Sequence, residues 1–494
     1  ALGRNSDTPV DYIQDDRYYF APAITWKPDE ANELTVLARY QKADTKAGAG
    51  FLPAAGTLLP NPNGRISPSL YTGEPNANDY IKTLKSLGYE FRHDFGGGVE
   101  FNQSARLMDS EVEPAVTVGT FGLLADQRTL FRYLWSTRED EKTFGLDNNL
   151  QWKFSTGRAE HTLLAGLDYR RAEWNYDSNF VFAATGLDAY NPVYGSMPNL
   201  APNFDPLTTA STRQTQSQLG LYVQDQIKLD RWVFTVGGRQ DWVGTDTNGG
   251  HQSDDKFSAR VGVNYVFDNG LAPYVGWSQS FQPTVGADWF GNAFVPTTGE
   301  QVEAGLKYQP ANGKVLATLA LYEVTQENTL TVDPDPTHPL ASIQQGETKV
   351  RGVELEGRWN VGRGLSVYGA YAYIDSEVTK SNDPATLGKQ IALQPKHSAS
   401  AGGDYTITSG ALSGLGFGAG VRYTGKHYGD APNLWETPSY TLFDAAVHYD
   451  FSNWRFQLNV QNVGDKEYIS ACNAVYWCYY GYERSVRATA RYVW

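Results

Sequence analysis

The sequence predicts an all-β chain that folds as a transmembrane antiparallel β-barrel. Apolar and polar residues alternate with a period of two in many segments, as in Val302–Tyr308 and Trp454–Val460. Successive side chains of a strand point to opposite faces, so each such segment has one apolar and one polar face. Aromatic residues mark the strand ends, and short connections alternate with long ones. No segment shows the pattern of an amphipathic helix.

The composition narrows the class of protein further. The chain has 494 residues with 41 basic and 55 acidic side chains, a net charge of −14, and 13% aromatic residues. The length alone would suggest about three soluble domains. The acidic balance argues against a nucleic-acid partner, because phosphate binding needs clustered Lys and Arg. No run of 18 apolar residues occurs, so no transmembrane helix is expected.

The alternation fits a soluble sandwich as well as a membrane barrel, and three features favour the barrel. Several segments are about ten residues or longer. Aromatic residues stand where interfacial girdles would lie, among them Trp232, Trp359, Trp454 and Trp494. Short connections such as 267–270 alternate with long ones at 43–85, 177–212, 282–298 and 330–344. A soluble β-propeller is the structural alternative, but the sequence lacks its repeat of about 40–50 residues.

About nineteen complete strands are predicted, with residues 1–7 as the top of another. Bacterial single-chain barrels have even strand numbers, so residues 1–494 are interpreted as one barrel domain whose beginning is missing. Ala1–Arg4 has no apolar region of a signal peptide, which agrees with that interpretation. The strands are expected at 17–27, 33–42, 86–95, 98–110, 126–155, 158–175, 213–229, 231–245, 254–267, 270–281, 299–309, 313–329, 345–360, 364–380, 394–408, 413–427, 438–450, 453–463 and 482–494.

One charge conflicts with the predicted lipid-facing pattern. Asp225 shares its strand face with Leu221, Val223 and Ile227. A carboxylate on that face would be costly at the centre of a bilayer. We therefore expect a register break, a bulge or an interfacial position at Asp225.

The two cysteines lie close together in the segment Cys472–Cys478. They form no CxxC motif and have no His pair nearby, which argues against a zinc site. A local disulfide is the simplest interpretation and indicates an oxidising compartment. Two unrelated free thiols are the alternative.

Several motifs along the chain resemble those of TonB-dependent siderophore receptors, in matching order and spacing. Within that family the chain is most similar to the ferric hydroxamate receptors for ferrichrome and ferrioxamine. The family motifs are Ser280–Pro283, Gly299–Tyr308, Val350–Glu356, Val460–Tyr468 and Gly481–Arg484, and the hydroxamate branch shares Tyr18–Trp26, Phe51–Pro53, Tyr190–Val193 and the Cys472/Cys478 pair.

The resemblance implies a barrel of the 22-stranded type in the bacterial outer membrane, wide enough to need a plug in its lumen. It implies that this chain begins inside the third strand, so that the plug, the TonB box and the first two strands are absent. The implied partners are a ferric siderophore, TonB through that absent segment, lipopolysaccharide and outer-membrane lipid, with phage or bacteriocins as further candidates. No resident cofactor is implied, and iron enters only as the ferric ligand.

Aromatic residues of the outer connections are the candidate ligand-binding residues. A ferric hydroxamate is compact, weakly charged and partly apolar, so aromatic faces and a few hydrogen-bond donors suit it. Compared with ferrichrome receptors, aromatic residues are replaced at Gly48–Gly50, at Val118–Thr120 and at Asn473, which favours a linear ferrioxamine-type ligand. The candidates are Phe51, Phe121, Tyr190, Trp289, Phe290, Tyr476, Trp477 and Tyr479.

Enzymatic chemistry is not indicated. The sequence contains no GxSxG, HExxH or P-loop motif, and its seven histidines show no metal-ligand spacing. Acidic pairs such as Asp254-Asp255 are expected to be solvated loop charges rather than calcium ligands. The alternatives left open are a passive outer-membrane pore, a receptor for another iron chelate and, less favoured, an outer-membrane enzyme.

Overall fold

The computed structural model describes residues 2–6, 8–46, 51–182, 185–197, 200–333, 341–473 and 475–493, and these residues form strands and connections only. Within them, no helix is long and apolar enough to cross a bilayer. The wall strands are β1 (Leu2–Arg4), β2 (Asp15–Phe20), β3 (Ala23–Trp26), β4 (Asn32–Lys46), β5 (Asp79–Gly96), β6 (Val99–Leu123), β7 (Thr129–Thr156), β8 (Ala159–Phe182), β10 (Ala210–Leu229), β11 (Trp232–Thr247), β12 (Gly250–Tyr265), β13 (Leu271–Gln282), β14 (Thr297–Tyr308), β15 (Val315–Val332), β16 (Ser342–Gly362), β17 (Leu365–Lys380), β18 (His397–Thr406), β19 (Leu415–Thr424), β22 (Tyr440–Phe451), β23 (Trp454–Gln461) and β26 (Ser485–Tyr492).

These strands form one antiparallel sheet in chain order, as predicted. Strands β2 and β3 both pair with β4 and are two parts of one strand, interrupted at Pro22, which has no backbone N–H to donate. With β1 as a stub, and with the two-residue β9 (Leu187–Asp188) set aside, nineteen full strands form the described wall. The predicted strand number is therefore confirmed.

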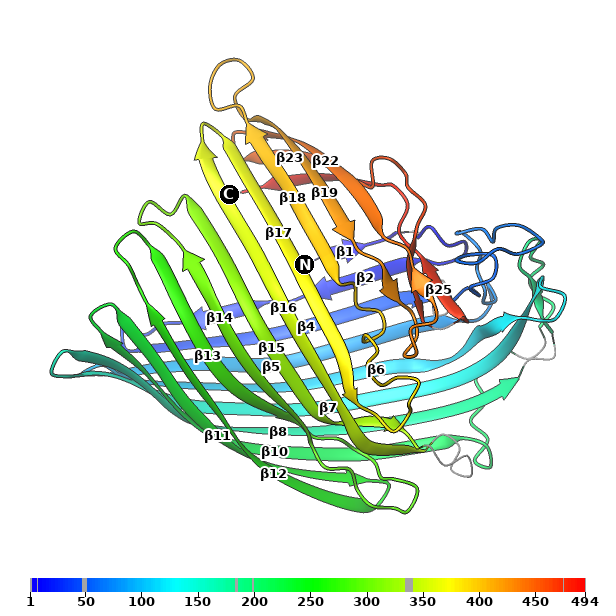
Figure 1. Ribbon diagram of the computed structural model, residues 1–494, viewed down its shortest axis with the longest axis horizontal. Helices are drawn as coiled ribbons and strands as arrows, with labels where there is room; N and C mark the ends of the chain where they lie inside the picture. Colours follow the sequence, from blue (N-terminus) through cyan, green and yellow to red (C-terminus); the bar gives the residue numbers. More distant parts are fainter. Residues whose placement is uncertain are drawn as a thin grey trace.

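The sheet curls into a barrel-like wall, and the blue first strands run behind the yellow and orange strands of the last third (Figure 1). Short turns such as 157–158 and 230–231 join the strands at one end. The long connections gather at the other end, at the right of Figure 1, which we call the outer end. Some outer connections are nevertheless short. For example, a turn at 248–249 joins β11 to β12.

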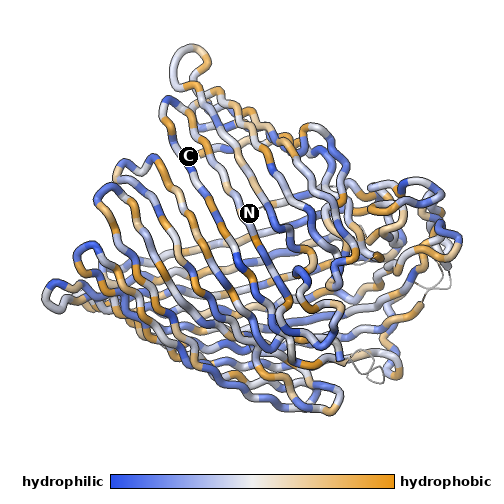
Figure 2. Tube along the Cα trace, viewed as in Figure 1, coloured by the Kyte–Doolittle hydropathy of each residue, from blue (hydrophilic) through white to orange (hydrophobic). Residues whose placement is uncertain are grey.

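The two faces of the wall differ in polarity, and Figure 2 shows the alternation along individual strands. On β11, Trp232, Phe234 and Val236 are exposed on the outside. Arg239 lies on the opposite face, where it donates to Asp168 (3.0 Å) and Asp241 (2.6 Å). The apolar face is thus turned outward and the polar face inward, which is the arrangement of a membrane barrel.

Two of the three expectations for Asp225, the bulge and the register break, are wrong, and the interfacial position stays a prediction. The pairing of Asp225 with Leu163 and Val236 is continuous, so neither a bulge nor a register break is present. It lies near the end of β10, close to the turn at Asp230, and its carboxylate is 2.7 Å from Nδ1 of His161. The strand end and the imidazole together reduce the cost of this charge on the outer face.

The hairpin of β6 and β7 is longer than predicted. The sequence predicted strand only to residue 110, whereas β6 continues to Leu123 and pairs with β7. A register shift between Val112 and Ala115 marks a bulge that contains Pro114, which cannot donate to the ladder. Val112 lies opposite Glu139, but Ala115 lies opposite Thr137, so the inserted residue exchanges the two faces of β6 above it.

Buried apolar residues gather in the outer connections rather than in the lumen. The largest cluster joins Leu52 to the tips of β7 and β9. The strands that border the connections extend into the ranges 43–85 and 177–212, which had been predicted as loop. Two expectations, the aromatic Trp494 at the end of the last strand and the replaced segment Gly48–Gly50, concern residues outside the described ones. The members of the largest cluster are Leu52, Ile66, Leu70, Leu130, Leu187 and Ala189.

Candidate functional site

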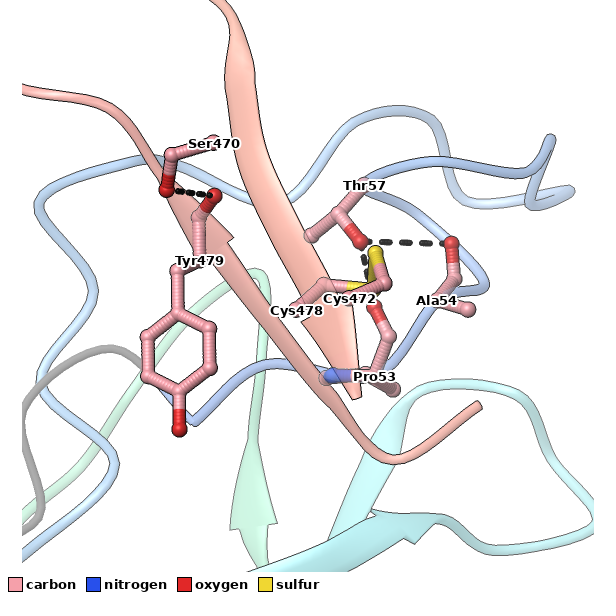
Figure 3. Close-up of a disulfide and its surroundings, with 7 residues drawn as sticks. All are labelled: Pro53, Ala54, Thr57, Ser470, Cys472, Cys478 and Tyr479. Atoms are coloured by element: carbon pink, nitrogen blue, oxygen red, sulfur yellow. Dashed lines mark hydrogen bonds between the residues drawn. A yellow bond between two sulfur atoms is a disulfide. The ribbon is translucent and has the colours of Figure 1, made fainter. Parts of the chain in front are cut away.

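The last outer connection folds into a small hairpin of β24 (Ile469–Asn473) and β25 (Trp477–Tyr480). Cys472 lies opposite Cys478 in this hairpin, and the two form the predicted disulfide. Both cysteines are fully buried. In Figure 3 the ring of Tyr479 points away from the disulfide. Tyr479 can therefore make contacts outside the buried core of the loop.

The connection between β4 and β5 is attached to this hairpin through backbone pairing. The N–H of Leu52 donates to the carbonyl of Cys478 (3.1 Å), and the N–H of Cys478 donates back to Leu52 (2.7 Å). The hydroxyl of Thr57 donates to the carbonyl of Pro53 (2.6 Å) and closes the next turn, as Figure 3 shows. Because Leu52 is buried, its neighbour Phe51 is directed to the other side, beside β25.

Four of the predicted ligand residues come together there. The ring centroid of Phe51 lies 5.4 Å from that of Tyr479 and 6.4 Å from that of Trp477. Trp477 lies 6.5 Å from Phe121 at the tip of β6. These are ordinary distances for interacting aromatic pairs.

The ring contacts continue onto β7 and β8 through residues that the sequence analysis missed. Tyr133 lies 4.7 Å from Phe121 and 5.0 Å from Phe180, and Phe131 lies 5.4 Å from Phe182. The alternation Asn179-Phe-Val-Phe182 was the available signal, but that segment had been predicted as loop. We call the whole set the aromatic cluster: Phe51, Phe121, Phe131, Tyr133, Phe180, Phe182, Trp477 and Tyr479.

The cluster lies on the lumen side of the wall. Strands β7 and β8 pair without any register shift, so residues of equal parity stay on one face. Tyr133 therefore shares a face with Asp147, and Phe180 shares a face with Asp168. Asp147 and Asp168 belong to the polar inner wall, where they bond Tyr222 and Arg239.

Gly119 allows Tyr133 to lie flat against the hairpin. The two residues are opposite one another on β6 and β7. A Cβ atom at Gly119 would come within 2.2 Å of the Tyr133 ring. Any side chain at this position would push the ring away from Phe121 and open the cluster.

The aromatic cluster presents an uncharged surface to a ligand. Burial raises the pKa of Tyr479 above its ordinary 10.0, with a smaller contribution from Tyr133. The phenol is therefore protonated at physiological pH and is available as a hydrogen-bond donor. The site thus combines aromatic faces with a phenol donor.

Tyr190 and Tyr476 border this arrangement in different ways. The hydroxyl of Tyr190 donates to the carbonyl of Gly64 (3.0 Å), and the guanidinium of Arg128 lies 5.6 Å from its ring. Tyr190 thus packs between connections, against the buried cluster around Leu52. The half-exposed ring of Tyr476 lies against Gly122, next to Phe121.

Trp289 and Phe290 lie apart from the aromatic cluster. They occupy the connection between β13 and β14 and are 52% and 76% exposed. Among the described residues, no ring contact joins them to the cluster. Whether any of the eight predicted residues touches ligand stays a prediction.

The site offers binding chemistry. Within the described ranges, no group of three or more His, Cys, Asp or Glu side chains is placed to hold a metal ion. A neutral chelate could stack on the rings and accept a hydrogen bond from Tyr479, while its metal stays inside its own ligand sphere.

Comparison with known proteins agrees with this architecture. Residues 25–463 match the family model described as TonB dependent receptor-like, beta-barrel. The chain belongs to the TonB-dependent receptors. It is an outer-membrane protein of this family, whose relatives are receptors and transporters.

Two curated relatives match almost the whole chain. The ferrichrome outer membrane transporter/phage receptor of Escherichia coli K12 is 35% identical and matches 99% of this chain and 69% of its own length. The ferrioxamine B receptor of Salmonella typhimurium LT2 is 36% identical and matches 98% of this chain and 69% of its own length.

Solved structures confirm the fold. The siderophore receptor PiuA of Acinetobacter baumannii superimposes with a TM-score of 0.87 at 20% identity, over 99% of this chain and 76% of that one. The ferric-catecholate import receptor Fiu of Escherichia coli K12 gives a TM-score of 0.86 at 19% identity, over 99% of this chain and 76% of that one. At these identities the likeness shows the fold alone.

Proposed function

We propose that this chain is the barrel of an outer-membrane receptor that takes up a ferric hydroxamate siderophore, with energy supplied through TonB. The observation that supports this most directly is the aromatic cluster on the lumen side of the outer end. Its rings and the protonated phenol of Tyr479 suit a compact, weakly charged chelate. The ferrichrome and ferrioxamine relatives bind ligands of this class by their names.

Between the two ligand shapes we favour a linear ferrioxamine-type hydroxamate. Asn473 and Val118–Thr120 stand where ferrichrome receptors carry aromatic residues. The cluster takes further rings from β7 and β8, at Phe131, Tyr133 and Phe180. In this proposal that set of rings, without an aromatic residue at position 473, suits a linear chelate.

The test is a tryptophan-fluorescence titration of the intact receptor with ferrioxamine B and with ferrichrome. We expect saturable quenching by both chelates, tighter for ferrioxamine B, and none by ferric citrate. If neither ferrioxamine B nor ferrichrome quenches the fluorescence, the proposed ligand class is excluded. Large stable conductances of the purified chain in planar bilayers would favour a passive pore instead.

Coupling to TonB and closure of the lumen belong, in this proposal, to a plug segment outside the chain. The TonB-dependent relatives support this, because the matched part covers 69% of their length. The proposal predicts that a receptor whose TonB-contacting segment is deleted still binds ferrioxamine B but no longer delivers iron. Unchanged iron uptake by that deletion variant would refute it.

A shallow groove of about 450 Å³ on the outer face supports a contact with lipopolysaccharide. Leu87, Leu107 and Phe144 line its apolar part, while Lys142 and Arg171 lie beside them. Acyl chains would contact the apolar residues and phosphates the cations. Lipopolysaccharide retained by the purified receptor should fall in a Lys142→Ala/Arg171→Ala variant, and unchanged retention would contradict this contact.

Phage or a bacteriocin could use the same outer connections. The Escherichia coli relative is a phage receptor by its name, and one structural neighbour with 20% identity is a complex of FpvAI with pyocin S2. We propose such use only as an accessory property. Killing assays with hosts that express this receptor, with and without the connection at 283–296, would test it.

A further inference from the structure

A buried ion pair lies behind the aromatic cluster. A terminal guanidinium nitrogen of Arg132 is 2.8 Å from Oε1 of Glu74, and the two side chains are 0% and 1% exposed. In the described part of the chain, it is the only ion pair in which both side chains are buried. Burying two charges is costly unless the geometry is good and further hydrogen bonds satisfy them.

Those further hydrogen bonds reach a third segment. The other carboxylate oxygen of Glu74 accepts from the backbone N–H of Gly195 (2.8 Å). Arg132 also donates to the carbonyls of Thr185 (3.3 Å) and Gly186 (3.2 Å). The pair therefore links the connection that contains Phe51, strand β7, and the connection that follows β8.

Two of the linked segments contribute rings to the cluster, and the third follows β8, which carries Phe180 and Phe182. Arg132 lies between Phe131 and Tyr133 on β7, and successive residues of a strand point to opposite faces, so the pair lies on the back of the aromatic wall. Thr185 follows closely after Phe182, the last residue of β8. The pair can thus hold these rings from behind.

Asn78 adds a second tether on the same side. Its side-chain amide exchanges two hydrogen bonds with the backbone of Val118 on β6, at 3.0 and 3.1 Å. Both Asn78 and Val118 are fully buried. This tether holds the Glu74 segment against the hairpin whose tip carries Phe121, so β6 and β7 are fixed by one connection.

We propose that Glu74 and Arg132 are positioning residues, which fix the aromatic cluster in its binding geometry without touching the chelate. This inference rests on the proposed function. Removing one partner leaves the other charge buried without compensation, so the connections must rearrange to hydrate it. The rings of Phe51, Phe131 and Tyr133 are then no longer held in fixed positions relative to one another. The parts of the strands nearer the short turns, at the end opposite the outer end, keep their pairing.

The experiment compares single and double variants of the intact receptor. Glu74→Gln and Arg132→Met each remove one charge, and the double variant Glu74→Leu/Arg132→Met replaces the pair by apolar side chains of similar size. Since such replacement of a whole buried pair is often neutral, each single variant should weaken ferrioxamine B binding at least about tenfold and the double variant should recover to within about threefold. Glu436→Gln, which breaks the exposed Lys426–Glu436 pair of another connection, is the control and should bind normally.

A ligand-free measurement separates positioning from binding. The emission of Trp477 is isolated as the difference between each variant and the same variant with Trp477→Phe. We expect a shift to longer wavelength in the single variants, because the indole becomes hydrated, and recovery in the double variant. Circular dichroism melting of the barrel should stay unchanged in all of them.

Several outcomes would overturn the inference. They are single variants that keep wild-type affinity and Trp477 emission, a double variant that fails to recover, a lower barrel melting temperature in the single variants, and weaker binding with unchanged Trp477 emission. If the unmodified receptor binds neither ferrioxamine B nor ferrichrome, the proposed function fails. The Trp477 spectra then still decide whether the pair fixes the cluster.

Discussion

The outer end contains two groups of aromatic residues that were both predicted to bind ligand but that differ in how the structure holds them. Phe51 is fixed by the backbone pairing of Leu52 with Cys478, and its ring lies against Tyr479. Trp289 and Phe290 lie at an exposed turn in which Asp288 accepts from the backbone N–H groups of Phe290 (2.9 Å) and Asn292 (2.8 Å).

The difference lies in what fixes each group from behind. The cluster is backed by a disulfide, by the buried ion pair of Glu74 and Arg132 and by buried apolar residues. The 283–296 connection is attached through Gln252, which donates to the carbonyl of Phe294 (2.7 Å), and through Gln344, which accepts from the N–H of Val295 (2.6 Å). The rings of Trp289 and Phe290 are nevertheless more than half exposed. Pre-organised rings lose less freedom when a ligand binds, so the cluster is the better binding surface.

Truncating rings should give the largest contrast between the two groups. Phe51→Ala or Tyr479→Ala removes an aromatic contact together with its apolar area, at about 2–3 kcal/mol, or about 30–150-fold in Kd for ferrioxamine B. Trp289→Ala and Phe290→Ala should change Kd less than about twofold. Fluorescence titration measures both, and a larger loss at Trp289 than at Tyr479 would reverse the comparison.

Removing the disulfide should have the next largest effect. Cys472→Ser/Cys478→Ser releases the hairpin that positions Tyr479, and a disulfide is worth about 2 kcal/mol or more. We expect about a tenfold weaker Kd with an unchanged melting temperature of the barrel. Reductant added to the unmodified receptor should reproduce the loss, and reductant should have no effect on the double variant.

The phenol of Tyr479 should contribute a smaller amount. Tyr479→Phe keeps the ring and removes one hydrogen bond, which is worth about 0.5–1.5 kcal/mol, or about 2–10-fold in Kd. Because burial raises the pKa of Tyr479, its neutral form persists below pH 10 and is lost only as the pH rises further. Affinity should therefore be flat from pH 7 to 9.5, and a decline at pH 8 that Tyr479→Phe abolishes would contradict this assignment.

The smallest expected effect is a loss of local stability at acidic pH in the connection at 425–439. His427 is buried in the pairing of β20 (His427–Tyr428) with β21 (Glu436–Thr437), and burial lowers its pKa below the ordinary 6.5. Its stabilisation is present above pH 6.5 and is lost as the pH falls toward its lower folded pKa. Hydrogen exchange of the β20–β21 amides, corrected for intrinsic rates, should be faster at pH 5 than at pH 7.5.

Two controls accompany this measurement. His427→Gln should remove the difference between the two pH values, because no group then gains a proton in this range. The connection at 283–296 contains no histidine, so its exchange should not change. An unchanged rate at β20–β21 in the unmodified receptor would contradict the role of His427.

The sequence analysis predicted the wall well because strand alternation is a local signal. Strand order and number follow from period-two patterns. The outward direction of the apolar face needed further signals, namely the long segments, the aromatic strand ends and the alternation of short and long connections. The extension of β6 beyond residue 110 was missed, because Glu113-Pro114 interrupts the alternation and suggests a strand end. The backbone pairing of β6 with β7 resumes at Ala115, directly after Pro114. The sequence of β6 alone does not show this pairing.

The candidate site was predicted in part. The Phe51 and Cys472–Tyr479 segments carry family motifs, so their rings could be proposed from the sequence. Phe180 and Phe182 were missed because 177–212 was taken for a loop. The Glu74–Arg132 pair joins residues 58 positions apart and has no local signature, so only the fold brings it to light.

The bulge at Pro114 also has a genetic consequence. Together with a second register shift between Thr120 and Leu123, it sets which of two adjacent residues at the tip of β6, Thr120 or Phe121, is presented toward Tyr133. Loss of one codon here would exchange the two faces of the tip and turn Phe121 away from the lumen. Closely related genes could thus acquire a new pocket lining through a single in-frame deletion, with every residue of the pocket itself unchanged.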